Sequence, residues 1–450
     1  MTAPATPASR PRPARRALDD LGLPVSADSL ALVAADDEPA WLSADRAAAW
    51  AAYESLPAEA NLLYTPYLDL RAAQLGEARL VSGPLASFDV ERPSDADALI
   101  VIDDGTRAGI ARSDAAAGIR ISVGHDVTDE ALLTAGQLPA SDKFAQLTRA
   151  LWSRVVVIDV PDGLVLEHPI VVRWALGAAD RALLTRTIVR LGAGAGAAIV
   201  EELVASEAAA GATGQAFFAG TTEVTLGAAS SLRVASLQEL PDHVVAIQHR
   251  VASIGEDASL QWALAQLGGR LVRARSDNRL EGDRSSVEQV EILFGSESQL
   301  FDLTSYTTHI GRDTTGDLLS KGALLDSART YLKGLITIEK TAIGTDSFLG
   351  EFGMNLSKQA RSVAIPSLEI DQPDCRRAAH SSSVGPIDET QLFYLESRGI
   401  PPDESRKFIV LGFLEPVVAR VPLASAQDRL RDLLEAKWAT GLAGDQEAAA

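Results

Sequence analysis

The central half of the chain alternates short apolar runs with glycine and small polar residues. From Arg154 to Ile370 the runs are rich in β-branched residues and leucine, as in VVVIDV, PIVVRWAL and RTIVRLG. Strands of roughly four to eight residues bounded by turn residues produce this pattern. Few stretches are long enough for helices, so the pattern predicts a mainly β core over residues 154–384.

A short sequence word recurs four times in this region. Each copy is an apolar residue, glycine, two variable residues, alanine or serine, one variable residue and leucine. The copies begin at Leu226, Ile254, Phe294 and Ile343, at intervals of 28, 40 and 49 residues. A corner glycine followed by an inward leucine suits the turns of a β-solenoid. Because the intervals are uneven, a β-sandwich with glycine turns stays open as the alternative.

The segment before the β core mixes helical and strand patterns. Ser43 precedes a helical run that continues to Ser55, with an acidic residue in the first turn, where the helix dipole favours it. Phe144 to Trp152 places apolar residues on one side of another helix. We expect an N-terminal α+β domain over residues 18–153, preceded by a disordered lead-in over residues 1–17.

Helical patterns return after the β core. A first helix is predicted at residues 388–398, with Gly399 positioned to end it. Pro401 and Pro402 suit the first turn of a second helix, because proline loses no hydrogen bond there. We expect a C-terminal helical domain over residues 385–440 and a flexible tail over residues 441–450.

The second of these helices carries more apolar residues than one buried stripe requires. They are Phe408, Ile409, Leu411, Phe413 and Leu414. We expect the additional apolar residues to contact a partner protein.

Composition narrows the classes of function. The 450-residue chain has a net charge of −20 and a pI near 4.8, which argues against nucleic-acid binding because that requires a basic surface. We find no apolar run of the roughly 18 residues that a membrane span requires. The single cysteine, Cys375, fits a reducing compartment, so we expect a cytoplasmic protein. One cysteine also cannot supply the Cys₄ set that usually holds an iron–sulfur cluster.

His380 is the main candidate for chemistry, because neutral imidazole is a competent iron or zinc ligand. Without partners, a loop histidine beside Arg376 and Arg377 is equally well explained as solvated. Cys375 lies five residues before it, and in an extended strand this odd offset directs the two side chains to opposite faces. Cys375 is therefore a weak ligand candidate.

Two enzyme alternatives remain. Gly192, Gly194 and Ala197 match a G-x-G-x-x-A dinucleotide-binding turn, which predicts a nicotinamide-dependent oxidoreductase, although the following AAIVEELVA has strand as well as helical character. A β-helix polysaccharide lyase would instead use clustered carboxylates. The available aspartates are Asp302, Asp313, Asp317, Asp326 and Asp346.

The motif GRDTTGD, residues 311–317, has Walker-like glycine spacing but places Asp317 where the phosphate-binding lysine is required. We therefore expect no bound nucleotide, and an ATP-driven process would need a separate ATPase subunit.

Three C-terminal segments carry a family resemblance. SLEIDQPDCRRAAHSSSVG (367–385), LFYLESRGI (392–400) and VLGFLEPVV (410–418) resemble the SufB/SufD scaffold proteins, which assemble iron–sulfur clusters with the ATPase SufC. EPAWLSADRAAAWAAYESLP (38–57) resembles an early helix of SufD-type chains. The SufB segment that contains that subunit's essential cysteine corresponds to FLGEFGMNLS (348–357), which has none. The resemblance therefore favours a SufD-type subunit.

The resemblance implies a central right-handed parallel β-helix between the N-terminal α+β domain and the C-terminal helical domain. It also implies a non-enzymatic scaffold that pairs with a SufB-type subunit, or with itself as a homodimer, and docks SufC. An iron–sulfur cluster would be assembled transiently at the subunit interface, with His380 as an interface ligand. The expected partner-binding residues are Phe393, Tyr394, Arg398, Phe408, Phe413 and Leu414.

Overall fold

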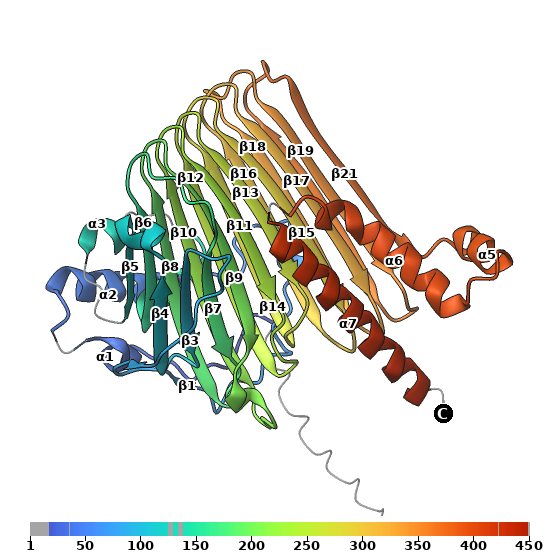
Figure 1. Ribbon diagram of the computed structural model, residues 1–450, viewed down its shortest axis with the longest axis horizontal. Coiled ribbons are helices and arrows are strands. Elements are labelled where there is room, and N and C mark those ends of the chain that lie inside the picture. The colour runs from blue at the N-terminus through green and yellow to red at the C-terminus, as the bar shows by residue number, and fades with distance from the viewer. Residues whose placement is uncertain (1–17, 36, 125–128, 134–137, 422, 449–450) are drawn as a thin grey trace, which may run out of the picture.

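Two long parallel sheets, formed by strands that alternate between them, make up most of the protein (Figure 1). The computed structural model describes residues 18–448 except 36, 125–128, 134–137 and 422. From β6 onward each even-numbered strand joins one sheet and each odd-numbered strand joins the other. The result is a parallel β-solenoid of about eight turns, which confirms the predicted fold class.

The first sheet, called sheet A, has the order β20-β18-β16-β14-β12-β10-β8-β6-β5, with β1 beside β8. Its strands are β1 (Arg79–Leu80), β5 (Arg120–Gly124), β6 (Arg154–Val160), β8 (Arg181–Leu191), β10 (Ala216–Leu226), β12 (Val244–Ile254), β14 (Leu271–Leu280), β16 (Leu300–His309), β18 (Arg329–Ile338) and β20 (Arg361–Ile370).

The second sheet, called sheet B, has the order β2-β4-β3-β7-β9-β11-β13-β15-β17-β19-β21. Its strands are β2 (Ala86–Ser87), β3 (Ala98–Asp103), β4 (Arg107–Arg112), β7 (Ile170–Leu176), β9 (Gly196–Ala205), β11 (Ser231–Gln238), β13 (Ser259–Gln266), β15 (Ser286–Gly295), β17 (Thr315–Leu324), β19 (Asp346–Asn355) and β21 (Arg377–Pro386).

The helices lie near the two ends of the chain. The α-helices are α1 (Ser29–Val33), α2 (Ala40–Ser55), α3 (Glu130–Leu133), α4 (Lys143–Leu151), α5 (Glu389–Ser397), α6 (Pro402–Val418) and α7 (Ala424–Ala448). Short 3₁₀ turns are η1 (Thr65–Tyr67), η2 (Asp114–Gly118) and η3 (Glu207–Ala209). The predicted helices at 43–55, 144–152, 388–398 and from Pro402 are confirmed, although α2 begins at Ala40 and so Ser43 is not its N-cap.

The recurring word marks corners of the solenoid, and its uneven intervals have a simple cause. The copies at Leu226, Ile254 and Ile343 connect a strand of sheet A to the next strand of sheet B. The copy at Phe294 connects β15 of sheet B to β16 of sheet A, which is the other corner. Turn length also varies, because paired residues in successive turns lie 26 apart (Val245 with Leu271) to 32 apart (Arg329 with Arg361) from β10 to β20.

Close approach between turns explains one of these glycines. A Cβ atom at Gly255 would lie 2.6 Å from the backbone oxygen of Leu226 in the preceding turn. No side chain fits at that distance, so the corner requires glycine there.

Inward-facing side chains fill the space between the two sheets, which we call the lumen. They include the largest hydrophobic cluster, with Phe218 and Val272 from sheet A and Val234 and Trp262 from sheet B. Because alternate residues of a strand face opposite sides, each strand contributes every second residue to the lumen.

The N-terminal segment packs on the outer face of sheet A through apolar contacts and buried charges. Trp50, Leu147 and Phe217 belong to one cluster of buried residues there. Asp142 caps α4 by accepting hydrogen bonds from the backbone N–H groups of Phe144 and Ala145 at 2.9 and 2.8 Å.

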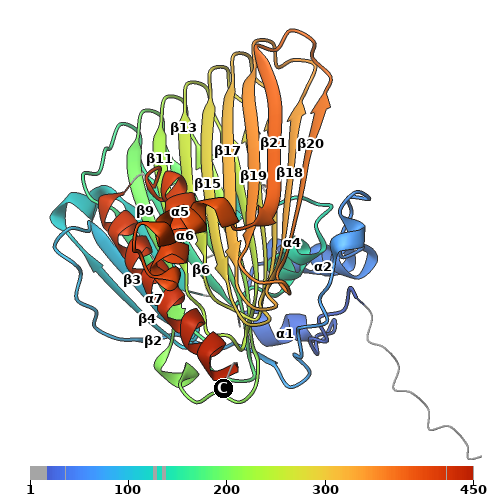
Figure 2. The ribbon, with the colours of Figure 1, turned by 90° about the vertical axis from the view of Figure 1, so that its right-hand side faces the viewer.

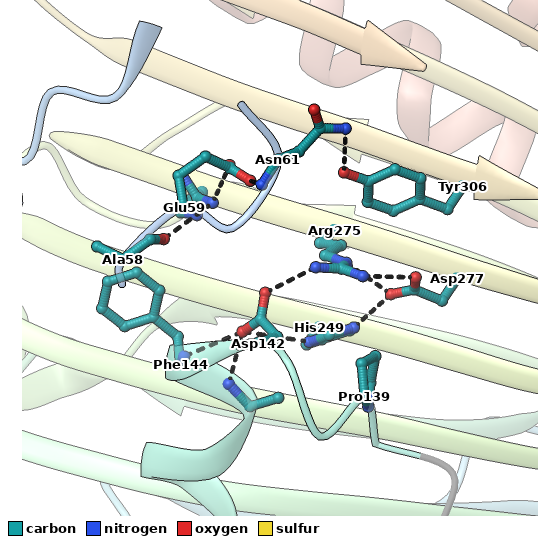
Figure 3. A network of polar contacts seen from close by, with 12 residues as sticks. Ala58, Glu59, Asn61, Pro139, Asp142, Phe144, His249, Arg275, Asp277 and Tyr306 are labelled. Atoms are coloured by element: carbon teal, nitrogen blue, oxygen red, sulfur yellow. Dashed lines mark hydrogen bonds and ion pairs between the residues drawn. The ribbon is translucent and has the colours of Figure 1, made fainter. Parts of the chain in front are cut away.

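Asp142 also joins a network on the strands below it (Figure 3). Arg275 Nη1 donates to Asp142 at 3.0 Å, and His249 Nε2 lies 2.6 Å from Asp277. Burial alone would raise the pKa of Asp142, but His249, Arg275 and Arg273 together lower it. The charges thus hold the N-terminal segment on the solenoid.

The C-terminal helices α6 and α7 cover the outer face of sheet B, opposite α1, α2 and α4 (Figure 2). Val410, Leu414 and Trp438 are buried in one cluster with Val290 and Phe294 of β15. Helix α7 runs through residues 441–448 of the expected tail, and the expected lead-in at residues 1–17 lies outside the described residues. The predicted domain boundaries stay predictions.

Candidate functional site at the open end of the solenoid

The last turn of the solenoid leaves both sheets without a further strand. β20 pairs only with β18, and β21 pairs only with β19, among the strands in the described part of the chain. No residue of β20 or β21 is fully buried. Outer backbone N–H and C=O groups of such edge strands are available to pair with another chain. We call this end, formed by β20 and β21, the open end.

His380 lies in β21 at the mouth of the lumen. It pairs in register with Leu349 of β19, whose side chain is buried in the lumen. Residues paired in neighbouring parallel strands share a face, so His380 also faces the lumen. It is exposed because no further turn covers it. Its flanking arginines have ion-pair partners, since Arg376 contacts Asp313 and Arg377 Nε lies 2.7 Å from Asp346.

Cys375 lies in the turn before β21, outside the strand. It is a half-buried free thiol that packs with Leu368 and Ala378 against an apolar cluster. The alternation of faces along a strand therefore does not apply between Cys375 and His380. The ligand roles of both residues stay predictions.

The described residues of this chain do not by themselves assemble a recognisable metal centre. No group of three or more histidine, cysteine, aspartate or glutamate residues suited to a metal occurs among the described residues. A metal held by His380 would therefore draw further ligands from another molecule or from the sulfur it carries.

Two buried carboxyl groups, Glu291 and Glu351, face the lumen, and neither is among the candidate residues predicted from the sequence. Burial raises the pKa of Glu291 to about 7, opposed by Arg250 and by a hydrogen bond with Gln266. Burial also raises the pKa of Glu351 to about 8, opposed by a backbone hydrogen bond from Ile365. Strongly perturbed acids in a cleft are candidates for function.

The C-terminal helices present a second exposed surface. Helix α5 has no buried residue, and its Phe393 and Tyr394 are 72% and 57% exposed. Phe408 of α6 is 60% exposed, and the guanidinium of Arg398 lies 5.2 Å from the ring of Tyr394. These exposed aromatic and cationic residues belong to α5, its C-cap and α6, and α5 projects beyond β21 (Figure 1).

The remaining two expected partner residues hold α6 in place. Leu414 is fully buried against sheet B. Lys321 of β17 donates to the backbone oxygen of Phe413 at 2.8 Å, and its ammonium lies 4.7 Å from the Phe413 ring. In this chain Phe413 and Leu414 therefore pack α6 against sheet B, and the partner-binding role of Phe393, Tyr394, Arg398 and Phe408 stays a prediction.

The dinucleotide-binding alternative is wrong. Gly192 and Gly194 form a corner between β8 and β9, and Ala197 lies in β9 with its side chain in the lumen core. A strand follows these glycines where a phosphate-binding turn requires the N-terminus of a helix.

The lyase alternative is also not supported, because the described residues contain no group of three or more acidic residues that could hold a metal ion, and Asp302, Asp313 and Asp346 are engaged in ion pairs. Asp302 is buried against Arg273 and Lys333 on sheet A, at 2.7 and 2.5 Å. Asp313 and Asp346 form the ion pairs with Arg376 and Arg377.

Within the described part of the chain, no helix combines the length and apolar character needed to cross a membrane.

Comparison with known proteins gives a consistent result. The family model for the SUF system FeS cluster assembly SufBD core domain matches residues 174–413. An iron-sulfur cluster assembly SufBD family protein of Mycobacterium tuberculosis is 30% identical over 243 residues, or 52% of this chain and 61% of the relative. The iron-sulfur cluster assembly protein SufD of Bacillus subtilis is 27% identical over 313 residues, or 69% of this chain and 70% of that protein.

A SufBD family protein of Staphylococcus epidermidis is 26% identical over 298 residues, or 66% of this chain and 63% of the relative. The chain thus spans about three fifths of the length of the mycobacterial and staphylococcal relatives.

Proposed function

Because the chain belongs to the SufBD family of SUF-system iron–sulfur cluster assembly proteins, we propose that it is a SufD-type scaffold subunit. It pairs with a SufB-type subunit at the open end and docks a SufC-type ATPase through α5 and α6. It does not itself catalyse a reaction or bind nucleotide, and it acts in the cytoplasm. A cluster is built transiently at the seam between the two scaffold chains.

The observation that carries this proposal is the uncovered last turn. Solenoids normally need their ends covered against edge pairing. Here the N-terminal strands β4 and β5 run antiparallel to their neighbours at the other end of the sheets, whereas no further strand of the described chain pairs with β20 or β21. Ile370 and Val384, at 46% and 39% exposure, add apolar surface to that edge. A partner with matching edge strands would continue both sheets.

The same geometry supports a metal role for His380. A seam formed at β21 would enclose the mouth of the lumen, where His380 faces. Ligands from the partner chain would then complete the coordination that the described residues of this chain lack.

The ATPase surface rests on α5, whose aromatic residues Phe393 and Tyr394 are largely exposed among the described residues. Exposed aromatic and arginine side chains of this kind are frequent anchors of protein interfaces. ATP-driven movement of a docked motor would reach the seam through α6, which packs on β15 and β17.

Co-expression with SufB-type and SufC-type partners, followed by an anaerobic pull-down and metal analysis, tests the function. We expect Phe393→Glu to lose the ATPase and retain the SufB-type chain, and the pair Ile370→Arg with Val384→Arg to do the reverse. Leu62→Glu is the matched control, because Leu62 is 87% exposed and lies in the N-terminal segment. Failure of the unmodified chain to retain either partner would overturn the proposal.

A further inference from the structure

A row of alternating carboxyl and hydroxyl side chains leads along the lumen to the open end. The strand register pairs Glu291 of β15 with Ser320 of β17, Ser320 with Glu351 of β19, and Glu351 with Ser382 of β21. Neighbouring strands lie about 4.8 Å apart, so successive side chains of the row are within reach directly or through one water. Glu291, Ser320 and Glu351 are buried, whereas Ser382 is exposed.

The row faces the lumen in every strand. Its positions alternate with residues such as Ile292 and Leu319, which pack outside the lumen under α6 and α7. They are two residues from Leu293, Leu318 and Leu349, whose side chains are buried inside. The row is thus shielded from solvent along its length and emerges only at the open end.

Glu351, one of the two acids of the row, has no basic side chain paired with it within the described part of the chain. No salt bridge of Glu351 occurs among the described residues, and its carboxylate accepts one hydrogen bond, from the backbone N–H of Ile365 at 3.0 Å. Glu291 and Tyr64 are the titratable groups that interact with it, and His380 is the titratable group on the same face of β21. From sheet A, Gly334 approaches Glu351 and brings no charge. Burying an unpaired carboxyl group lowers the stability of the fold. A glutamate at position 351 is therefore better explained by function than by stability.

The inner end of the row has a fixed charge. Arg250 of β12 is buried in the lumen, and its positive charge lowers the pKa of Glu291, against the larger effect of burial. Its Nη2 atom donates to Ser236 at 2.9 Å and to Glu201 at 3.2 Å. Glu201 and Ser236 pair in register and continue the same row of lumen positions, separated from Glu291 by Leu264.

We propose that the row Glu291–Ser320–Glu351–Ser382 is a proton relay that exchanges protons between the lumen and the open end. The inference rests on the proposed function, because cluster building at the seam supplies the protons. When a thiol becomes an iron ligand, its S–H bond breaks, an S–Fe bond forms and a proton leaves without its electron pair.

The relay accounts for that proton. Ser382 Oγ accepts it and passes its own hydroxyl proton to a carboxyl oxygen of Glu351. The former carboxyl proton of Glu351 passes to Ser320 Oγ, and the Ser320 hydroxyl proton passes to the carboxylate of Glu291. Ser382, Glu351 and Ser320 each gain one O–H bond and lose one, Glu291 gains one, no electron changes place, and the net result is one proton moved inward. The reverse sequence returns a proton to a base at the seam.

Infrared spectroscopy of the isolated chain tests whether the row holds exchangeable acids. We expect a carbonyl band of protonated carboxyl groups to persist at pH 7, to disappear as pH rises, and to lose one component in Glu291→Gln and another in Glu351→Gln. Glu288→Gln is the matched control, because Glu288 lies on the outer face of β15. Loss of the whole band by pH 6 would overturn the proposal, whether or not the complex forms.

The relay itself is tested by the rate of cluster assembly in the reconstituted complex, measured against pH in H₂O and in D₂O. We expect Ser320→Ala to slow assembly about tenfold or more and to change the solvent isotope effect, and Ser320→Thr to restore both. An unchanged rate and isotope effect in Ser320→Ala would also overturn it. If the unmodified complex builds no cluster, the proposed function fails, and the infrared result still decides whether the row stores protons.

Discussion

Replacing Glu351 with glutamine should stabilise the protein increasingly as pH rises. Burial raises the pKa of this carboxyl from 4.5 to about 8 in the folded chain. The folded state therefore holds a proton that the unfolded state releases above pH 4.5, so the stability contributed by this group is complete below that pH and is lost as pH rises towards 8. At about 1.36 kcal/mol per pKa unit, roughly 3 to 4 kcal/mol is lost between pH 5 and pH 8.

The glutamine variant keeps the shape and the oxygen that accepts the Ile365 N–H but has no proton to lose. Urea unfolding followed by tryptophan fluorescence at pH 5, 6, 7 and 8 measures the difference. We expect the free energies of unfolding of the two proteins to diverge by about 3 kcal/mol across this range, with the variant more stable at pH 8. Glu288→Gln, on the outer face of β15 and half-buried, should follow the unmodified protein. Parallel pH profiles for Glu351→Gln and the unmodified protein would refute the assignment of a neutral buried acid.

Four further substitutions test other parts of the structure. His380→Ala should impair cluster transfer to an acceptor protein while the complex still co-purifies, and Ser381→Ala is its neighbour control; normal transfer in His380→Ala would reject the ligand role. Lys333→Met should lower the free energy of unfolding by about 3 to 5 kcal/mol, because Asp302 and Glu59 lose a buried counterion. Arg284→Met breaks only exposed ion pairs and should leave the free energy of unfolding nearly unchanged in the same denaturation assay. Trp438→Ala should cost about 3 to 5 kcal/mol and loosen α7, read as faster hydrogen exchange in that helix, because the ring is buried beside Phe294. Gly334→Ala should cost about 1 to 3 kcal/mol, since its Cβ would crowd Leu349 and Glu351; an unchanged urea midpoint would contradict the close packing of the lumen there.

The strands of the solenoid and its flanking helices could be predicted from the sequence because interactions between residues close in the chain specify them. Glycine corners, β-branched runs and the prolines before α6 act over a few residues, and each predicted element appears at nearly its predicted place. The uneven intervals of the recurring word made the repeat look irregular. They arise because the same pattern occurs at both corners of the solenoid. The family resemblance, not the residue pattern, distinguished a solenoid from a sandwich.

Features that depend on register between distant turns were not predictable. Glu291, Ser320, Glu351 and Ser382 lie 29, 31 and 31 residues apart, and they align only once the length of each turn is known. Asp142 and Arg275 meet because an N-terminal helix packs on sheet A, which no local pattern reveals. A signal did exist for the row, since polar residues repeat at inward positions of otherwise apolar strands.

The C-terminal helices also determine how the coil responds to force. Across them, Arg429 reaches Glu202 of β9 at 3.6 Å and also contacts Glu239 after β11, Lys437 donates to Leu267 after β13 at 2.7 Å, and α6 packs on β15 and β17. Five successive turns of the solenoid are therefore linked to the same pair of helices. A pull applied to α6 would therefore tilt these five turns together instead of separating them from one another.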